Sequence, residues 1–375
     1  MCGPICSRCC NSARRRAVRL RQAVIVLATL SQSACASINY YAHAVSGQLN
    51  LLAKRAPIVA LTENPETPEA LRQRLHTVID IRAFASRALH LPDNGSYRTY
   101  VDLGRPYVVW NVFATPEFSL TPKRWCFPLI GCVSYRGYFA QQRAERYASY
   151  LDNEGYDTYV GGARAYSTLG WFADPVLNTM LEQPTANLAG LIFHELAHQR
   201  LYLKGDVGFS EAFAVALERE GTRRWLQSQG SVEAREAYEW SLAQRREFLE
   251  LIEATRQRLE GLYAQALDVV EKRASKAQIL WELRATYRQR QELGKLADYE
   301  GWFTTELNNA KLAAVATYYQ LVPAFERLLA FYQGDLLGFY RACEVLASLP
   351  PADRTALLAE LLGSETTHVS ERSTG

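Results

Sequence analysis

Hydrophobic and polar residues along this chain repeat mainly with the period of an α-helix. Residues 232–296 are rich in Glu, Arg, Gln, Ala and Leu and contain no proline. Their length predicts an antiparallel helical hairpin that turns near residues 273–276. The pattern predicts other helices over residues 38–54, 67–90, 139–151, 187–203, 211–220, 311–332, 335–347 and 351–362.

A second pattern, rich in Tyr, Val and Trp, covers residues 97–103 and 107–114 and predicts strands. Residues 158–160 predict a further strand shortly before the helix at 187–203. That strand could accept a peptide along its free edge by strand addition, or it could be an ordinary sheet edge. The expected fold class is therefore α+β and predominantly helical, with a small sheet and a long antiparallel helical hairpin.

These elements also predict how the chain is divided. We expect a mixed α/β core over residues 35–230, the hairpin over 231–300, C-terminal helices packed on the core over 301–362, and a disordered tail over 363–375.

Charge separates the N-terminal segment from the rest of the chain. The net charge of +3 includes six Arg, and no Lys, Asp or Glu, in residues 1–34. The remainder has 36 of the 42 basic residues against all 39 acidic ones, a net charge of −3. A body with this balance gives no electrostatic reason to expect nucleic acid as a partner.

Residues 1–34 have the order of a secretory signal peptide. A basic cluster around residues 14–16 precedes the short apolar run 23–30, and Ser-Ala-Cys follows at Cys35. The site resembles a bacterial lipobox, although Gln32 stands where Leu is usual, and predicts a lipid on Cys35. A plain cleaved signal and an uncleaved anchor are the alternatives. With Ala36 next, we expect a periplasm-facing protein of the bacterial cell envelope, in the outer rather than the inner membrane.

The chemistry of the chain is concentrated in His194-Glu195-Leu196-Ala197-His198, within the predicted helix 187–203. His194 and His198 would stand one turn apart on one face, where two imidazoles can bind one Zn²⁺. Glu195 would lie beside the metal, where it can accept a proton from an attacking water. The motif therefore predicts a zinc-dependent hydrolase.

A catalytic zinc takes three protein ligands and keeps one open position. Glu211, thirteen residues after His198, is the expected third ligand, at the start of a helix opened by Ser210 and closed by Gly221. Glu218 is the reserve ligand on the same face. Asp206 is a candidate to orient one of the ligand histidines.

Two cysteines bracket a short loop. Cys126 and Cys132 lie six residues apart around Phe-Pro-Leu-Ile-Gly. In an oxidising periplasm they are expected to form a disulfide, with two free thiols as the alternative.

Several stretches together resemble a family of bacterial lipoproteins, predicted aminopeptidases of zincin metallopeptidase type. They are residues 45–49 (VSGQL), 126–138 (CFPLIGCVSYRGY), 165–171 (AYSTLGW), 194–199 (HELAHQ), 211–214 (EAFA) and 308–325 (NNAKLAAVATYYQLVPAF). The resemblance implies a zincin-like core, Zn²⁺ bound by His194, His198 and Glu211, and Glu195 as the base. Ser210 stands where Asn more often precedes the third ligand, and Ser also caps helices.

The expected reaction is peptide hydrolysis in the envelope, most simply by an aminopeptidase acting on a peptide substrate. Tyr318 is the candidate donor to the oxyanion, because related zincins often use a Tyr or His from a later helix; a packed structural Tyr is the alternative. The rival function is a non-catalytic, lipid-anchored protein with a structural metal, whose hairpin binds an envelope protein partner.

Overall fold

The computed structural model describes residues 40–127, 131–294, 296–297 and 299–363. The predicted signal peptide 1–34, Cys35 and the tail beyond residue 363 lie outside this part and stay predictions. The chain divides into two compact units, residues 1–53 and 54–375. In the first, residues 40–53 are helical. The structure is 64% helical with small sheets, which confirms the predominantly helical α+β class.

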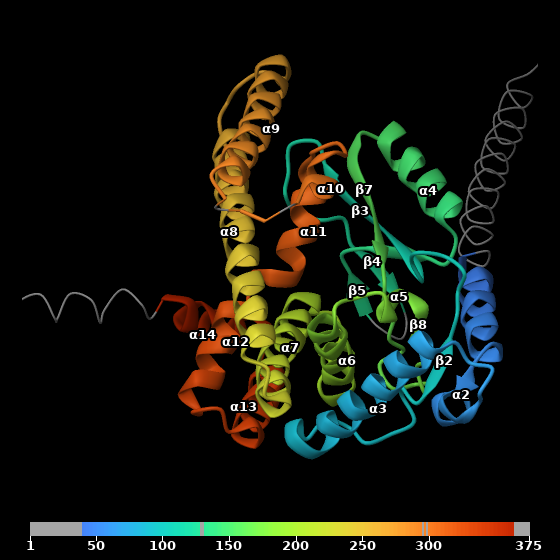
Figure 1. Cartoon of the computed structure of the whole chain (residues 1–375). Coiled ribbons are helices and arrows are strands. Elements are labelled where there is room, and N and C mark those ends of the chain that lie inside the picture. The colour runs from blue at the N-terminus through green and yellow to red at the C-terminus, as the bar shows by residue number, and fades with distance from the viewer. Residues whose placement is uncertain (1–39, 128–130, 295, 298, 364–375) are drawn as a thin grey trace, which may run out of the picture. The chain divides into compact units, whose positions relative to one another are not determined.

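The helices of the second unit occupy most of its length (Figure 1). They are α2 (Ile58–Glu63), α3 (Glu69–Leu89), α4 (Gln141–Asn153), α5 (Asn178–Leu181), α6 (Thr185–Arg200), α7 (Val207–Gln229), α8 (Val232–Tyr263), α9 (Val269–Glu292), α10 (Glu300–Phe303), α11 (Asn309–Tyr319), α12 (Val322–Phe331), α13 (Leu336–Ser348) and α14 (Pro351–Gly363).

The strands form small sheets. They are β1 (Ala56–Pro57), β2 (Thr99–Val101), β3 (Val109–Pro116), β4 (Trp125–Phe127), β5 (Gly131–Val133), β6 (Arg136–Tyr138), β7 (Tyr156–Ala163) and β8 (Val176–Leu177). Their orders are β1-β2-β8, β6-β3-β7 and β4-β5. The longest pairing is antiparallel, between β3 and β7, and aligns Val109 with Ala163 and Pro116 with Tyr156.

The β6-β3-β7 sheet is covered by a helix on each face. Because successive residues of β3 point to opposite faces, Val112 and Ala114 pack with Ala144 and Ala148 of α4. Phe113 instead packs with α11. A sheet with two covered faces explains why β3 is an almost continuous apolar run.

The helical hairpin exists, but its predicted turn is wrong. Helices α8 and α9 meet at residues 264–268, and α9 runs through the expected turn at 273–276 (Figure 1). Asp268 starts α9 with a capping box: its side chain accepts from Glu271 N, and Glu271 accepts from Asp268 N. This local cap, rather than the length of the pattern, determines where the second helix begins.

The helix that carries Glu211 is longer than predicted at both ends. Asp206, not Ser210, is its N-cap and accepts from Phe209 N at 3.1 Å. Gly221 lies inside α7, and Gly230 ends it. A Cβ on Gly221 would lie 2.7 Å from Cδ1 of Leu89 and 2.9 Å from Cδ2 of Phe193. Gly221 therefore permits α3, α6 and α7 to approach closely.

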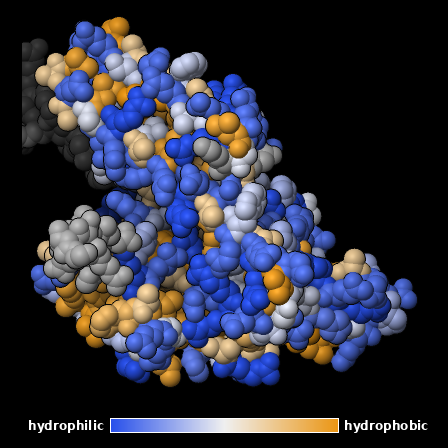
Figure 2. All heavy atoms as spheres, turned by 60° about the vertical axis from the view of Figure 1, so that its left-hand side comes forward, coloured by the Kyte–Doolittle hydropathy of each residue, from blue (hydrophilic) through white to orange (hydrophobic). Residues whose placement is uncertain are grey.

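None of the helices in the described part is both long and apolar enough to cross a membrane. Over the face shown in Figure 2, hydrophilic residues predominate and hydrophobic ones form small, separate groups. On the hairpin, Trp240, Trp281 and Val270 are 58%, 64% and 74% exposed. The hairpin thus presents large apolar side chains to solvent.

Gly221→Ala should destabilise the fold. Helix propensity alone favours Ala by about 0.8–1 kcal/mol, but overpacking costs about 1–3 kcal/mol where neighbours cannot move. Leu89 and Phe193 are both fully buried, so we expect a net loss measured by urea unfolding. Gly261→Ala, on α8 with no atom near the added methyl, is the matched control and should gain about 0.5–1 kcal/mol. Equal gains from both changes would contradict this account of the packing.

Lys311 of α11 is buried, and its Nζ donates to Trp302 O and Thr305 Oγ1. Burial, together with the charge of Arg284, lowers the pKa of Lys311 to about 8. In the unfolded chain Lys311 keeps its proton up to about pH 10.5. Between about pH 8 and pH 10.5 the unfolded chain therefore binds more protons than the folded chain. Raising the pH through this window therefore favours the folded state.

We expect the stability of the wild type relative to Lys311→Met to rise between about pH 8 and about pH 10.5. Urea unfolding of both proteins across that range measures the difference, and the variant removes contributions from other titrating groups. A difference that is constant, or that falls as the pH rises, would show that Lys311 keeps its proton in the folded protein.

Candidate metal centre

Helices α6 and α7 lie side by side and bring the three expected ligands to one place (Figure 1). His194 and His198 share a face of α6, with their Nε2 atoms 3.1 Å apart. Oε2 of Glu211, on α7, lies 3.3 Å from Nε2 of His194 and 3.6 Å from Nε2 of His198. These three residues form a group that could hold a metal ion.

The spacing of these atoms fits zinc. Ligand atoms about 2.0–2.1 Å from a zinc ion at tetrahedral angles lie about 3.3–3.4 Å from each other, and the observed separations bracket that value. Oε2 of Glu211 is buried and has no hydrogen-bond partner of ordinary geometry among the described residues. A buried carboxylate oxygen beside two imidazole nitrogens is a donor set that a cation satisfies.

The histidines and the carboxylates of the site shift each other's pKa values. Burial acts to raise the pKa of Glu211, but the imidazoles of His198 and His194 outweigh it and lower that pKa to about 2. Burial acts to lower the pKa of His194, while the carboxylates of Glu211 and Glu218 raise it well above its usual value. Glu211 is therefore held as the carboxylate that metal ligation requires.

Glu218 orients His194. Its Oε2 lies 3.1 Å from Nδ1 of His194, so a proton on Nδ1 leaves Nε2 free to bind a metal. Burial acts to raise the pKa of Glu218, but His194 and the charge of Arg245 on α8 lower it overall. Glu218 was predicted as the reserve ligand, and the structure gives it this supporting position instead.

Asp206 was expected to orient one of the ligand histidines, and that prediction is wrong. Besides capping α7, its Oδ2 lies 3.0 Å from Nη2 of Arg354, which connects α14 to the link between α6 and α7. A short acidic side chain just before a helix usually caps it, so the position of Asp206 in the sequence already indicated a cap.

Glu195 is buried and stands beside the ligand group on α6. Burial raises the pKa of Glu195, while His194 and His198 partly oppose the rise. A carboxylate with raised proton affinity, next to a metal position, is suited to accept a proton.

Tyrosines from separate segments lie near the centre. Tyr318, the expected oxyanion donor, packs against the cluster of Phe113, Ala310 and Ala314, as do Tyr135 and Tyr159. Burial raises the pKa of Tyr135, and Glu211 raises it further. The same carboxylate contributes to the raised pKa of Tyr318, after burial and Tyr135. Both phenols thus lie within electrostatic reach of the third ligand.

Sequence reasoning did not single out Tyr135 or Tyr202. Tyr202 lies just beyond the end of α6 at Arg200, and its ring centroid is 5.9 Å from that of His198. Its closeness in sequence to a ligand, in the link between the two ligand helices, was the available signal. Tyr135 comes from the connection between β5 and β6, and only the fold brings it to the site.

The β4–β5 hairpin supports the link between α6 and α7. Cys126 and Cys132 pair across its strands and form a disulfide. Arg124 donates from Nη2 to Gly205 O at 2.9 Å. A Cβ on Gly131 would lie 2.9 Å from Gly205 N, so the two segments are in close contact.

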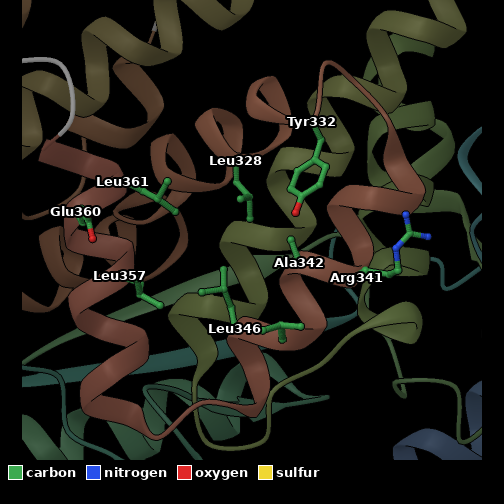
Figure 3. Close-up of a pocket in the computed structure, with 9 residues that line it drawn as sticks. Leu328, Tyr332, Arg341, Ala342, Leu346, Leu357, Glu360 and Leu361 are labelled. Atoms are coloured by element: carbon green, nitrogen blue, oxygen red, sulfur yellow. The ribbon is translucent and has the colours of Figure 1, made fainter. Parts of the chain in front are cut away.

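A groove of about 560 Å³ lies elsewhere, among α12, α13 and α14 (Figure 3). Leu328, Leu346 and Leu357 project into it, and the metal ligands are not part of its lining. Tyr332, Arg341 and Glu360 also line it, but the lining holds no histidine or cysteine and no group of converging metal ligands.

The fold and these donors define a mostly helical protein with a buried His-His-Glu group of metal-binding geometry. The model of a family described as "Putative aminopeptidase" matches residues 39–358, and the chain belongs to that family. This membership suggests a peptidase. No curated protein and no solved structure matches the chain.

If Glu218 orients His194, Glu218→Gln should weaken zinc binding by about 10–100-fold, the usual effect of losing such a partner. Competition with a chromogenic zinc chelator measures the affinity. Glu220→Gln is the matched control, because Glu220 lies on the same helix and pairs with Arg224 instead. Unchanged affinity in Glu218→Gln would assign Glu218 a role in packing only.

Proposed function

We propose that this chain is a zinc-dependent peptide hydrolase, acting as an aminopeptidase. The observation that carries the proposal is the convergence of Nε2 of His194, Nε2 of His198 and Oε2 of Glu211 at separations that suit one zinc ion. Membership of the family supports the peptidase class. The side chain of His194 is 13% exposed, more than those of Glu211 (8%) and His198 (6%), so the group keeps some contact with solvent.

A zinc ion held here supplies Lewis acidity that activates a water molecule and polarises the scissile carbonyl. Glu195 accepts the proton of the attacking water and transfers it to the leaving amine. Its burial keeps bulk water away from this transfer and increases its proton affinity. Glu218 keeps His194 in the tautomer that the site needs.

The oxyanion of the tetrahedral intermediate needs a donor, and tyrosine hydroxyls can supply it. Tyr318 remains our candidate, now with Tyr135 beside it in the same aromatic cluster. Their raised pKa values keep both phenols protonated, so each can donate a hydrogen bond to an oxyanion.

Strand β7 supports binding of an extended substrate, because among the described strands it pairs with β3 alone. Part of its backbone is already used: Asn308 Nδ2 donates to Thr158 O at 2.8 Å. We therefore propose the later half of β7, from Val160 to Ala163, as the segment that a peptide could join by strand addition.

The lipobox-like sequence at Cys35 supports an anchored location in the cell envelope, with the membrane as a partner through the lipid. It also leaves room for the rival function, a non-catalytic protein with a structural metal that binds an envelope protein. Exposed Trp240 and Trp281 on the hairpin favour that rival, since large exposed aromatic residues often mark contact surfaces.

Glu195→Gln distinguishes the two functions. The change removes the base but none of the three ligands, so we expect bound zinc to remain while peptide hydrolysis falls by at least about 100-fold. Zinc content by elemental analysis and cleavage of a peptide mixture by mass spectrometry, with and without chelator, measure both properties.

Two controls accompany this experiment. Glu220→Gln should keep both zinc and hydrolysis, whereas His194→Ala should lose both. Hydrolysis that persists in Glu195→Gln, or that chelator does not reduce in the wild type, would rule out the proposed chemistry. A cellular phenotype that survives Glu195→Gln would favour the binding function.

A further inference from the structure

The segment between β7 and β8, residues 164–175, holds two large aromatic side chains in solvent. Trp171 is 69% exposed and Phe172 is 48% exposed. Adjacent exposed aromatic residues of this size are informative, because apolar area of this kind is usually buried in a contact.

This segment is held in place by buried polar contacts. Asp174 is 1% exposed and accepts from Thr168 N at 2.9 Å and from Thr168 Oγ1 at 2.8 Å. Thr168 Oγ1 in turn accepts from Phe172 N at 3.0 Å. Asp174 O accepts from Tyr97 N at 2.6 Å. The aromatic pair is therefore presented by an ordered turn, so a ligand need not order it on binding.

The backbone turns sharply just before the pair. Leu169 has φ 55° and Gly170 has φ 84°. A branched residue such as Leu rarely adopts a left-handed conformation, and such strain is concentrated where a structure constrains a functional segment. These two residues direct the chain so that Trp171 faces outward.

The turn lies against the helix of the metal centre, on the side of Glu195. Glu195 and Gln199 are one turn apart on one face of α6. A Cβ on Gly170 would lie 3.8 Å from Cγ of Gln199, and Gln199 Nε2 donates to Ser96 Oγ at 3.1 Å. Ser96 Oγ also accepts from Asp174 N at 3.3 Å. One hydrogen-bonded chain thus joins the aromatic turn to the helix that carries the base.

We propose that Trp171 and Phe172 form a subsite for a bulky apolar side chain of the peptide substrate. Aromatic faces suit aliphatic and aromatic side chains. Two cations at this segment already have partners: Arg164 Nη1 lies 3.4 Å from Glu182 Oε2, and Arg55 Nη1 donates to Ala173 O at 3.0 Å. The proposal rests on the proposed peptidase function and adds its substrate class: peptides with a large apolar residue near the scissile bond.

The test measures equilibrium binding to the zinc-loaded Glu195→Gln protein, which does not depend on turnover. The probes are alanine hexapeptides with a single phenylalanine at each position in turn, and the all-alanine peptide. We expect phenylalanine at one position to tighten binding by about tenfold, and Trp171→Ala to remove that preference. Trp171→Phe should retain most of it.

Trp281→Ala is the matched control, since Trp281 is similarly exposed, at 64%, on α9 of the hairpin. It should leave the preference unchanged. If no position favours phenylalanine, or if Trp171→Ala behaves like Trp281→Ala, the subsite proposal is overturned. If Trp171→Ala instead weakens binding to anionic phospholipid vesicles and leaves peptide preference intact, the turn is a membrane contact and the proposal fails.

Hydrolysis by the wild type separates this inference from the function on which it rests. If the wild type cleaves peptides but shows no preference that depends on Trp171, only the subsite proposal is contradicted. If binding shows a preference that depends on Trp171 but the wild type cleaves no peptide, only the proposed peptidase function is contradicted.

Discussion

Three electron-rich atoms at one buried point constrain the rest of this structure. Two imidazole nitrogens and a carboxylate oxygen lie 3.1–3.6 Å apart at the contact between α6 and α7. Bringing such groups out of water costs free energy unless a cation or a set of protons satisfies them. The helices must also come very close. Cβ atoms on Gly190 and Gly221 would meet Thr222 Oγ1 at 3.0 Å and Leu89 Cδ1 at 2.7 Å, respectively.

Other parts of the fold support this contact from different directions. The hairpin contributes Arg245, whose charge favours ionised Glu218. The C-terminal helices contribute Arg354, which pairs with Asp206 at the start of α7. The disulfide-linked β4–β5 hairpin lies against the link at Gly205. Since each support reaches α7 or the link before it, the position of Glu211 depends on segments far apart in the sequence. This explains why a short motif requires so large a fold.

Local patterns in the sequence predicted the elements well and their ends less well. The helical class, the hairpin and the positions of His194 and His198 follow from periodicity over a few turns. The start of α7 at Asp206 and its passage through Gly221 depend on a cap and on a close approach of α3, α6 and α7. Tyr135 reaches the site only through the arrangement of sheet and helices, which no local pattern encodes. The convergence of Glu211 with the histidines was predictable because the intervening link is short.

The central claim is that His194, His198 and Glu211 bind one zinc ion together. X-ray absorption at the zinc edge, on protein loaded with one equivalent of the metal, tests it most directly. We predict two imidazole nitrogens and further oxygen ligands at about 2.0–2.1 Å, with no sulfur. His194→Ala should lose this signature. A spectrum with fewer than two imidazoles, or a protein that takes up no zinc, would contradict the account.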